Sequence, residues 1–306
     1  MKALYYDEFG SRDQFRFGEV ADPHIGPDSL LVKVVAAGLN PVDYKVRQGH
    51  LAGLMDTMFP VVPGWDVAGV VVATGLDTPE YAVGDEVLAY ARKDVVGGGT
   101  VAELVSVPVR TAAHKPAGVS FTDAAALPLA GLTALQSIRR AGVQSGQTVL
   151  IHAAAGGVGS FATQLAVLAG ARVIGTASEA NHDYLRSLGA EPISYGDDLV
   201  EQALALAPER FDAILDYVGG TALDSVPTLL IPGGNVASVA DARAVAFGGH
   251  YVWVRPDHED LAHLVGLVAD GKLRVNLDGV YPFEKARDAY AELEGGHVRG
   301  KLVVTI

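Results

Sequence analysis

Residues 148–160, TVLIHAAAGGVGS, place a glycine-rich turn between two apolar segments. The first four residues are typical of a short buried strand, and apolar side chains recur at helical spacing from Val158 to Ala169. Glycine lets backbone N–H groups approach a pyrophosphate, and the start of a helix carries partial positive charge. An incidental strand–helix turn is the alternative, but both flanking elements of the dinucleotide fingerprint are present. We therefore expect phosphate contacts from Ala154, Gly156, Gly157, Val158 and Gly159.

The end of the next expected strand, residues 171–177, indicates which cofactor the turn would bind. An Asp or Glu there would hydrogen-bond the ribose 2′-OH of NAD and repel a 2′-phosphate. Thr176, Ala177 and Ser178 stand there instead, and Glu179 comes later. This pattern favours NADPH. The expected 2′-phosphate contacts are Ser178, Asn181 and Tyr195, with His182 as a further candidate, although capping and loop roles would also explain these residues.

Composition narrows the class of protein. The chain has 306 residues, of which 49% are hydrophobic, enough to fill two cores. Lys and Arg number 23 against 36 Asp and Glu, so the net charge of −13 disfavours nucleic acid and anionic membranes as partners. There is no cysteine, hence no disulfide or thiolate ligand. The N-terminal residues MKALYYDEF lack a signal-peptide pattern, which predicts a cytoplasmic protein.

The pattern of elements changes near residue 120. Before it, β-branched runs at 28–39, 67–73 and 85–90 are separated by turn residues, which predicts a β-rich domain. After it, helices and strands alternate, among them a helix over Asp123–Ala141, a strand over Phe211–Asp216 and a helix around His258–Asp270. This alternation predicts a doubly wound parallel sheet and an α/β fold class. The terminal strand in GKLVVTI is expected to return to the first domain. The predicted domains are therefore 1–119, completed by 272–306, and 120–271.

The chain carries seven motifs that together are specific: GLNPVDYKVRQG (38–49), VVPGWDVAGVV (61–71), YAVGDEV (81–87), LPLAGLTAL (127–135), HAAAGGVGS (152–160), DYVGG (216–220) and RGKLVV (299–304). Together they resemble the medium-chain dehydrogenase/reductase superfamily, in its zinc-independent quinone oxidoreductase (zeta-crystallin-like) branch. The resemblance covers essentially the whole chain. It implies a GroES-like catalytic domain, a Rossmann domain, an active site in the cleft between them, and NADPH-dependent reduction of quinones or other α,β-unsaturated carbonyls.

Metal ligands are missing from the positions where zinc-dependent relatives have them. Asn40 stands at the Cys position of that resemblance and Trp65 at the His position, and neither side chain replaces a zinc ligand. The nine histidines are scattered without ligand spacing. We therefore expect no metal.

Reduction without a metal needs a hydride donor and hydrogen-bond donors near the substrate oxygen where charge develops. Asn40, Tyr44 and Tyr90 are the candidate catalytic donors, and Tyr44 could also protonate the enolate. The alternatives are that Asn40 caps its loop and that the tyrosines pack. Asp43 and Asp66 are expected to fix backbone turns. Four more residues complete the expected cofactor contacts: Thr133, Val218, Ser238 and Lys301.

In the segment HYVWVRP, residues His250–Arg255 are typical of an apolar strand at the end of the doubly wound run. In the family the corresponding strand pairs across a two-fold axis, so the resemblance implies a homodimer. Two other functions stay open: an NADP(H)-binding redox sensor with little turnover, and an enoyl-thioester reductase. The second is disfavoured because this acidic chain has no evident basic surface for a phosphorylated carrier.

Overall fold

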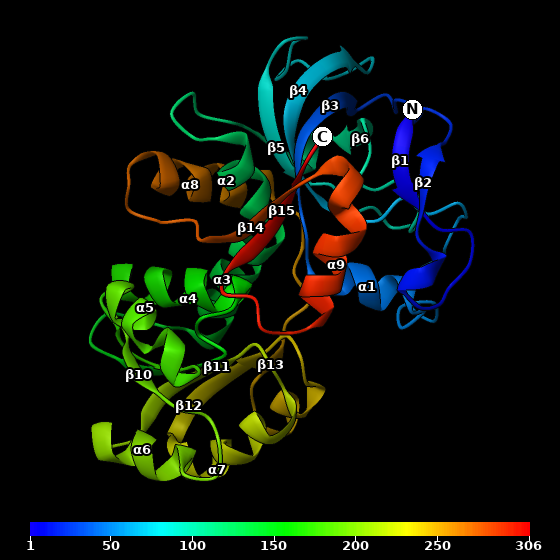
Figure 1. Cartoon of the computed structure of the whole chain (residues 1–306). Coiled ribbons are helices and arrows are strands. Elements are labelled where there is room, and N and C mark those ends of the chain that lie inside the picture. The colour runs from blue at the N-terminus through cyan, green and yellow to red at the C-terminus, as the bar shows by residue number, and fades with distance from the viewer. The chain divides into compact units, whose positions relative to one another are not determined.

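The computed structural model describes all 306 residues, which form two compact units (Figure 1). The first unit comprises Met1–Leu132 and Pro256–Ile306, and the second comprises Thr133–Arg255. Helix α3 (Pro128–Ala141) begins in the first unit and ends in the second. No helix is long and apolar enough to cross a membrane.

The first unit is mostly β-structure. Its strands are β1 (Lys2–Tyr5), β2 (Arg16–Glu19), β3 (Ser29–Gly38), β4 (Asp66–Thr74), β5 (Glu86–Tyr90), β6 (Leu104–Pro108), β7 (Ala112–His114), β14 (Leu277–Pro282) and β15 (Lys301–Thr305). Its helices are α1 (Pro41–Arg47), α2 (Phe121–Ala126), α8 (His258–Ala269) and α9 (Ala286–Glu294), with 3-10 turns η1 (Arg12–Gln14), η2 (Val109–Thr111) and η6 (Phe283–Lys285).

The main sheet of the first unit has seven strands, in the order β14-β15-β3-β4-β5-β7, with β6 paired to β3. The terminal strand β15 returns to this unit as expected and pairs antiparallel with β3, with Val303 opposite Gly38. Gly38 has a steric reason to be glycine, because a Cβ there would lie 2.1 Å from the Ala125 carbonyl oxygen in α2. The sheet thus positions the loop that follows Gly38, where α1 begins.

The second unit alternates strands and helices. Its strands are β8 (Thr148–His152), β9 (Arg172–Thr176), β10 (Glu191–Ile193), β11 (Phe211–Asp216), β12 (Leu230–Ser238) and β13 (His250–Tyr251). Its helices are α4 (Gly157–Leu168), α5 (His182–Ser187), α6 (Leu199–Leu206) and α7 (Val226–Leu229), with 3-10 segments η3 (Glu179–Asn181), η4 (Gly220–Ser225) and η5 (Ala242–Phe247).

The six strands of the second unit form one parallel sheet in the order β10-β9-β8-β11-β12-β13. Figure 1 shows helices on both faces of this sheet, which explains why its central strands are almost wholly apolar. The strand order reverses between β8 and β11. In sheets of this kind, ligands bind at the carboxyl ends of the strands beside that reversal.

The structure differs from the sequence predictions at two elements. The helix expected over Asp123–Ala141 is divided into α2 and α3, because Pro128 has no N–H for a continuous helix and instead starts α3. The strand expected over 250–255 is limited to β13, which pairs only with β12.

The limits of the two units also differ from the predicted 119/120 and 271/272 boundaries. Helices α2 and α8 account for the difference, because α2 packs on β3 and β4 while α8 packs on β7 and η2. An amphipathic helix pattern does not reveal which sheet the helix covers.

Candidate functional site

The glycine-rich turn lies between β8 and α4, as expected from the sequence. A Cβ on Gly159 would lie 2.2 Å from the Ala153 carbonyl oxygen and 2.7 Å from the Ala154 Cα, so the turn and the helix pack closer than any side chain would allow. The Ala153 and Ala154 amides bond to the Thr176 hydroxyl and carbonyl oxygens, each at 3.0 Å. The turn is therefore held against α4 by close packing and against β9 by hydrogen bonds.

The start of α4 offers groups that suit a pyrophosphate. Gly156 precedes the helix in an extended conformation, and the N–H groups of its first turn have no partner within the helix. Gly156, Gly157 and Val158 are partly exposed, whereas Ala154 and Gly159 are buried. The close packing at Gly159 and the free amides at the helix start fit the phosphates of a dinucleotide.

Two of the residues expected to contact the 2′-phosphate lie together after β9. The Asn181 amide donates to the Ser178 hydroxyl at 3.2 Å. A ring nitrogen of His182 lies 3.5 Å from the Ser194 hydroxyl, and the following residue, Tyr195, is exposed. All four candidates thus follow β9 or β10, which are neighbouring strands, and Ser178, Asn181 and His182 are only partly buried.

Asp216 organises the carboxyl ends of β11 and β12. Its Oδ1 accepts from the Val218 and Gly219 amides at 3.0 and 2.9 Å, and its Oδ2 accepts from the Ser238 hydroxyl at 2.6 Å. Ser238 also accepts from the amides of Ala240 and Asp241. Sequence reasoning named Val218 and Ser238 but missed Asp216, although this residue ends an apolar strand and begins the motif DYVGG. Val218 is exposed, whereas Ser238 is fully buried and engaged within the unit.

His152 ends β8 beside Asp216 and is also buried. Burial lowers the pKa of His152 to about 4, although the neighbouring Asp216 carboxylate acts in the opposite direction. The imidazole is therefore neutral at neutral pH. Thr133, another expected cofactor contact, is buried in α3.

In the first unit, Asn40 belongs to a buried polar cluster. Its side-chain amide donates to Asp66 Oδ2 at 2.8 Å, and its Oδ1 accepts from Lys301 Nζ. The same ammonium donates to the Leu39 carbonyl oxygen at 2.7 Å and lies 3.8 Å from Asp66 Oδ2. This differs from the cofactor contact expected for Lys301, because its ammonium is engaged inside the unit. Asn40 likewise acts here by positioning its loop.

Asp43 and Asp66 join the same cluster. Asp43 Oδ2 accepts from the backbone N–H of Asn40 at 2.9 Å and from the Tyr290 hydroxyl at 3.3 Å, and Asp66 Oδ1 accepts from the backbone N–H of Leu129 at 2.9 Å. Burial raises the pKa of Asp43 to about 7 and that of Asp66 to about 6. Both carboxylates fix backbone turns, as expected. They also face Lys301, and burial lowers the pKa of this lysine.

The two candidate tyrosines have different surroundings. Tyr90 is the last residue of β5 and is 1% exposed, with its ring 6.2 Å from that of Trp65, and burial raises its pKa. This position does not favour Tyr90 as a donor to a substrate. Tyr44 on α1 is half-buried, and its pKa is raised first by burial and then by the Glu294 carboxylate.

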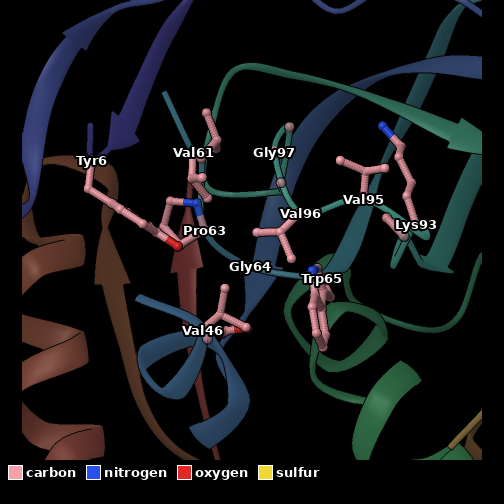
Figure 2. Close-up of a pocket in the computed structure, with 15 residues that line it drawn as sticks. Tyr6, Val46, Val61, Pro63, Gly64, Trp65, Lys93, Val95, Val96 and Gly97 are labelled. Carbon is pink, nitrogen blue, oxygen red and sulfur yellow. The ribbon is translucent and has the colours of Figure 1, made fainter. Parts of the chain in front are cut away.

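A small pocket lies in the first unit beside this cluster (Figure 2). Its cavity has a volume of about 10 Å³. The Tyr6 hydroxyl and Asp43 Oδ1 are buried there without a protein partner, and burial lowers the pKa of Lys93. Its lining residues are Tyr6, Asp43, Val46, Val61, Val62, Pro63, Gly64, Trp65, Ala91, Lys93, Val95, Val96, Gly97, Gly98 and Gly99.

Asn40 and Trp65 stand at the two positions where zinc-dependent relatives have metal ligands. Asn40 is bonded within the cluster and Trp65 packs on Tyr90. No group of three or more His, Cys, Asp or Glu side chains is arranged to hold a metal ion.

Two protein families match parts of this chain. The alcohol dehydrogenase GroES-like domain matches residues 26–117, and the family described as zinc-binding dehydrogenase matches residues 188–304. The chain is 38% identical to a 2-methylene-furan-3-one reductase of Solanum lycopersicum and 37% identical to an NADPH-dependent alkenal/one oxidoreductase, chloroplastic, of Arabidopsis thaliana. Each alignment covers 99% of this chain and 79% of the relative.

A solved structure shares the whole fold. The quinone oxidoreductase from Coxiella burnetii superimposes with a TM-score of 0.90 at 35% identity, covering 100% of this chain and 99% of that one. The similarity therefore extends over both units.

Proposed function

Because the chain belongs to the medium-chain dehydrogenase/reductase family, we propose that it is an NADPH-dependent reductase of quinones or other α,β-unsaturated carbonyls that works without a metal. One observation carries the proposal: the tightly packed fingerprint turn of the second unit is combined with a β9 end that bears hydroxyl and amide groups in place of a carboxylate. The names of the relatives support it, since they include NADPH-dependent alkenal/one and quinone oxidoreductases.

In this proposal the second unit binds the cofactor. The amides at the start of α4 bind the pyrophosphate, and Ser178, Asn181 and Tyr195 bind the 2′-phosphate. When bound, NADPH supplies the hydride. The neutral His152 and the loops fixed by Asp216 complete the carboxyl edge of the sheet beside it.

The first unit serves the substrate. Its buried cluster of Asn40, Asp66 and Lys301 holds the loop before α1 in place, so that Tyr44 is presented from a rigid element. The Tyr44 hydroxyl donates to the substrate oxygen as negative charge develops on it, and either Tyr44 or water then supplies a proton to the enolate carbon. Asn40 is a positioning residue in this account.

The direct test is NADPH oxidation across quinones, enals, enones and enoyl thioesters, with and without exhaustive chelation. We expect turnover with quinones and enones and no loss on chelation. Binding of NADPH without its oxidation by any acceptor would make the protein a sensor, and recovery of activity only with added zinc would refute the metal-free mechanism.

Wild-type protein should bind NADPH at least about tenfold tighter than NADH, and Ser178→Asp should remove that preference. A carboxylate beside the 2′-phosphate adds like-charge repulsion of at least about 1.4 kcal/mol, which corresponds to tenfold in affinity. Fluorescence titration with both nucleotides measures the ratio. Ser187→Asp, at the last residue of α5, adds the same charge as a control. Equal affinities in the wild type would contradict the assignment.

Tyr44→Phe should slow enone reduction about tenfold or more and leave benzoquinone reduction within about threefold. A donor aimed at developing charge contributes up to about 10²–10³ in rate, whereas a quinone accepts electrons easily and needs it less. Steady-state kinetics with both acceptors provide the comparison within one variant. If neither rate changes, Tyr44 is a packing residue.

A homodimer remains part of the proposal, formed by two copies of β13 pairing across a two-fold axis. Tyr251 in this edge strand is 43% exposed, whereas Val252 is 6% exposed and belongs to the unit's own core. Tyr251→Lys should therefore reduce the sedimenting mass from twice 31.8 kDa to 31.8 kDa without unfolding the chain. A wild-type monomer at micromolar concentration would refute the dimer. The cytoplasmic location also stays a prediction.

A further inference from the structure

Two buried oxygen atoms in the Figure 2 pocket have no hydrogen-bond partner within the protein. They are the Tyr6 hydroxyl and Asp43 Oδ1, and both residues line the pocket. Tyr6 is 0% exposed and Asp43 3%, so bulk solvent does not reach either oxygen. Burial of a polar group without a hydrogen bond costs free energy, and the cost is greatest for a charged group. Two such oxygens in one pocket therefore indicate a site for a polar ligand.

The surrounding structure holds both side chains in place. Tyr6 forms an antiparallel bridge with Val61, and its ring packs edge-on against that of Phe15, with the ring centroids 6.0 Å apart. The other carboxylate oxygen of Asp43, Oδ2, accepts from the backbone N–H of Asn40 at 2.9 Å. Figure 2 shows the Tyr6 side chain reaching into the pocket from one side, with its hydroxyl directed inward. Both unpartnered oxygens are therefore fixed at the wall of the pocket.

The volume of the pocket limits the ligand to one small molecule. A cavity of about 10 Å³ is that of one water molecule. A buried water needs at least two polar partners, and here a hydroxyl can donate to it while a carboxylate oxygen accepts from it. A cation of similar size is disfavoured by the charge of Lys93, which lines the same pocket. We propose that the pocket binds one ordered water molecule, which links the Tyr6 hydroxyl to Asp43 Oδ1.

This water ties the first strand to the start of α1. The hydrogen bonds of Asp43 Oδ2 fix the turn before α1, while the water on Oδ1 joins that turn to Tyr6, the residue after β1. Tyr6 is then a positioning residue, which acts on Asp43 through the water. The inference goes beyond the proposed function and does not depend on it, because every group lies in the first unit and no cofactor takes part.

High-resolution crystal structures of the wild type and of Tyr6→Phe test the site. Tyr6→Phe keeps the ring and removes only the hydroxyl. In the wild type we expect one water peak within about 3.0 Å of both oxygens, and in Tyr6→Phe this peak should be absent or displaced. An empty pocket in the wild type, a metal-like coordination shell around the peak, or a water that keeps its position in Tyr6→Phe would overturn the inference.

The pH dependence of stability gives a second readout, which packing alone would not move. Burial raises the pKa of Asp43 to about 7, and a donor at Oδ1 favours the ionised carboxyl group, so loss of that donor raises this pKa further. Tyr6→Phe should therefore increase the unfolding equilibrium constant roughly tenfold or more at pH 8.5, where Asp43 is ionised, but only about threefold at pH 5.5. The other charged or titratable groups around the pair are the same in both proteins: Arg47, Asp66, Lys93, Tyr290 and Lys301.

Tyr5→Phe is the matched control, because it removes the hydroxyl of the preceding residue, which is only partly buried. It should change the unfolding equilibrium constant by less than about twofold at either pH. An equal effect of Tyr6→Phe at pH 5.5 and pH 8.5 would show that its hydroxyl does not act on the Asp43 carboxylate, which contradicts the link through water.

Discussion

Gly159→Ala is expected to weaken NADPH binding at least about 100-fold, because the new Cβ would lie 2.2 Å from the Ala153 carbonyl oxygen. The position of a Cβ is fixed by the backbone, so no side-chain rotation relieves this clash. The turn must therefore move away from α4. Amide bonds to a charged phosphate contribute about 1.5–3 kcal/mol each, and loss of two of them accounts for the expected change. Fluorescence titration with NADPH measures it, with circular dichroism as a check on folding.

Two further alanine variants calibrate this result. A Cβ on Gly156 would lie 3.3 Å from the same carbonyl oxygen, so Gly156→Ala should have a smaller effect. Gly266 lies inside α8 with open space around it, so Gly266→Ala should leave the affinity unchanged and add up to about 1 kcal/mol of stability. NADPH affinity within threefold of wild type in a folded Gly159→Ala protein would show that this turn does not bind the cofactor.

Lys301→Met should destabilise the first unit by about 3–5 kcal/mol at pH 8, since it removes the cation from a buried cluster. The change leaves the Asn40 Oδ1 and Leu39 carbonyl oxygens without their donor and leaves Asp43 and Asp66 facing one another without compensation. Urea unfolding monitored in both units gives the change in stability. Lys272→Met breaks an exposed pair with Asp270 and should cost less than about 0.5 kcal/mol.

The destabilisation should diminish as the pH falls. Burial already raises the pKa of Asp43 to about 7 and of Asp66 to about 6, and loss of the lysine would raise both further. Because the folded state then binds protons more tightly than the unfolded state, stability increases as the pH falls through these values. At pH 5 the variant should thus lie closer to wild type than at pH 8. An equal loss at both values would mean that the carboxyl groups do not titrate with folding.

Elements made of contiguous residues were predicted well from sequence alone. The strand expected at Phe211–Asp216 coincides with β11, and the helix expected at 258–270 is α8. The fingerprint turn and the Ser178–Asn181 pair also lie where expected, because a strand, a turn and a helix within about 30 residues carry their own pattern. Pro128 shows the limit of periodicity, since the apolar repeat continues through a residue that divides the helix.

The polar interior could not be predicted in the same way. Asn40 meets Asp66 across 26 residues and Lys301 across 261, and no local pattern signals such pairings. The motif RGKLVV therefore suggested a cofactor contact for Lys301, while the sheet returns this residue to the loop before α1. Likewise Tyr90 was a reasonable donor by its place at the end of a strand, and only the packing against Trp65 reveals its burial.

The transfer of deuterium from 4-deuterated NADPH to 3-nonen-2-one tests the proposed function most directly. We expect a saturated ketone that carries deuterium on the carbon β to the carbonyl, with a solvent hydrogen on the α carbon, as NMR of the product would show. Deuterium on the carbonyl carbon of an allylic alcohol would instead indicate alcohol dehydrogenase chemistry. That result, or unchanged enone beside intact NADPH, would contradict the reductase proposed here.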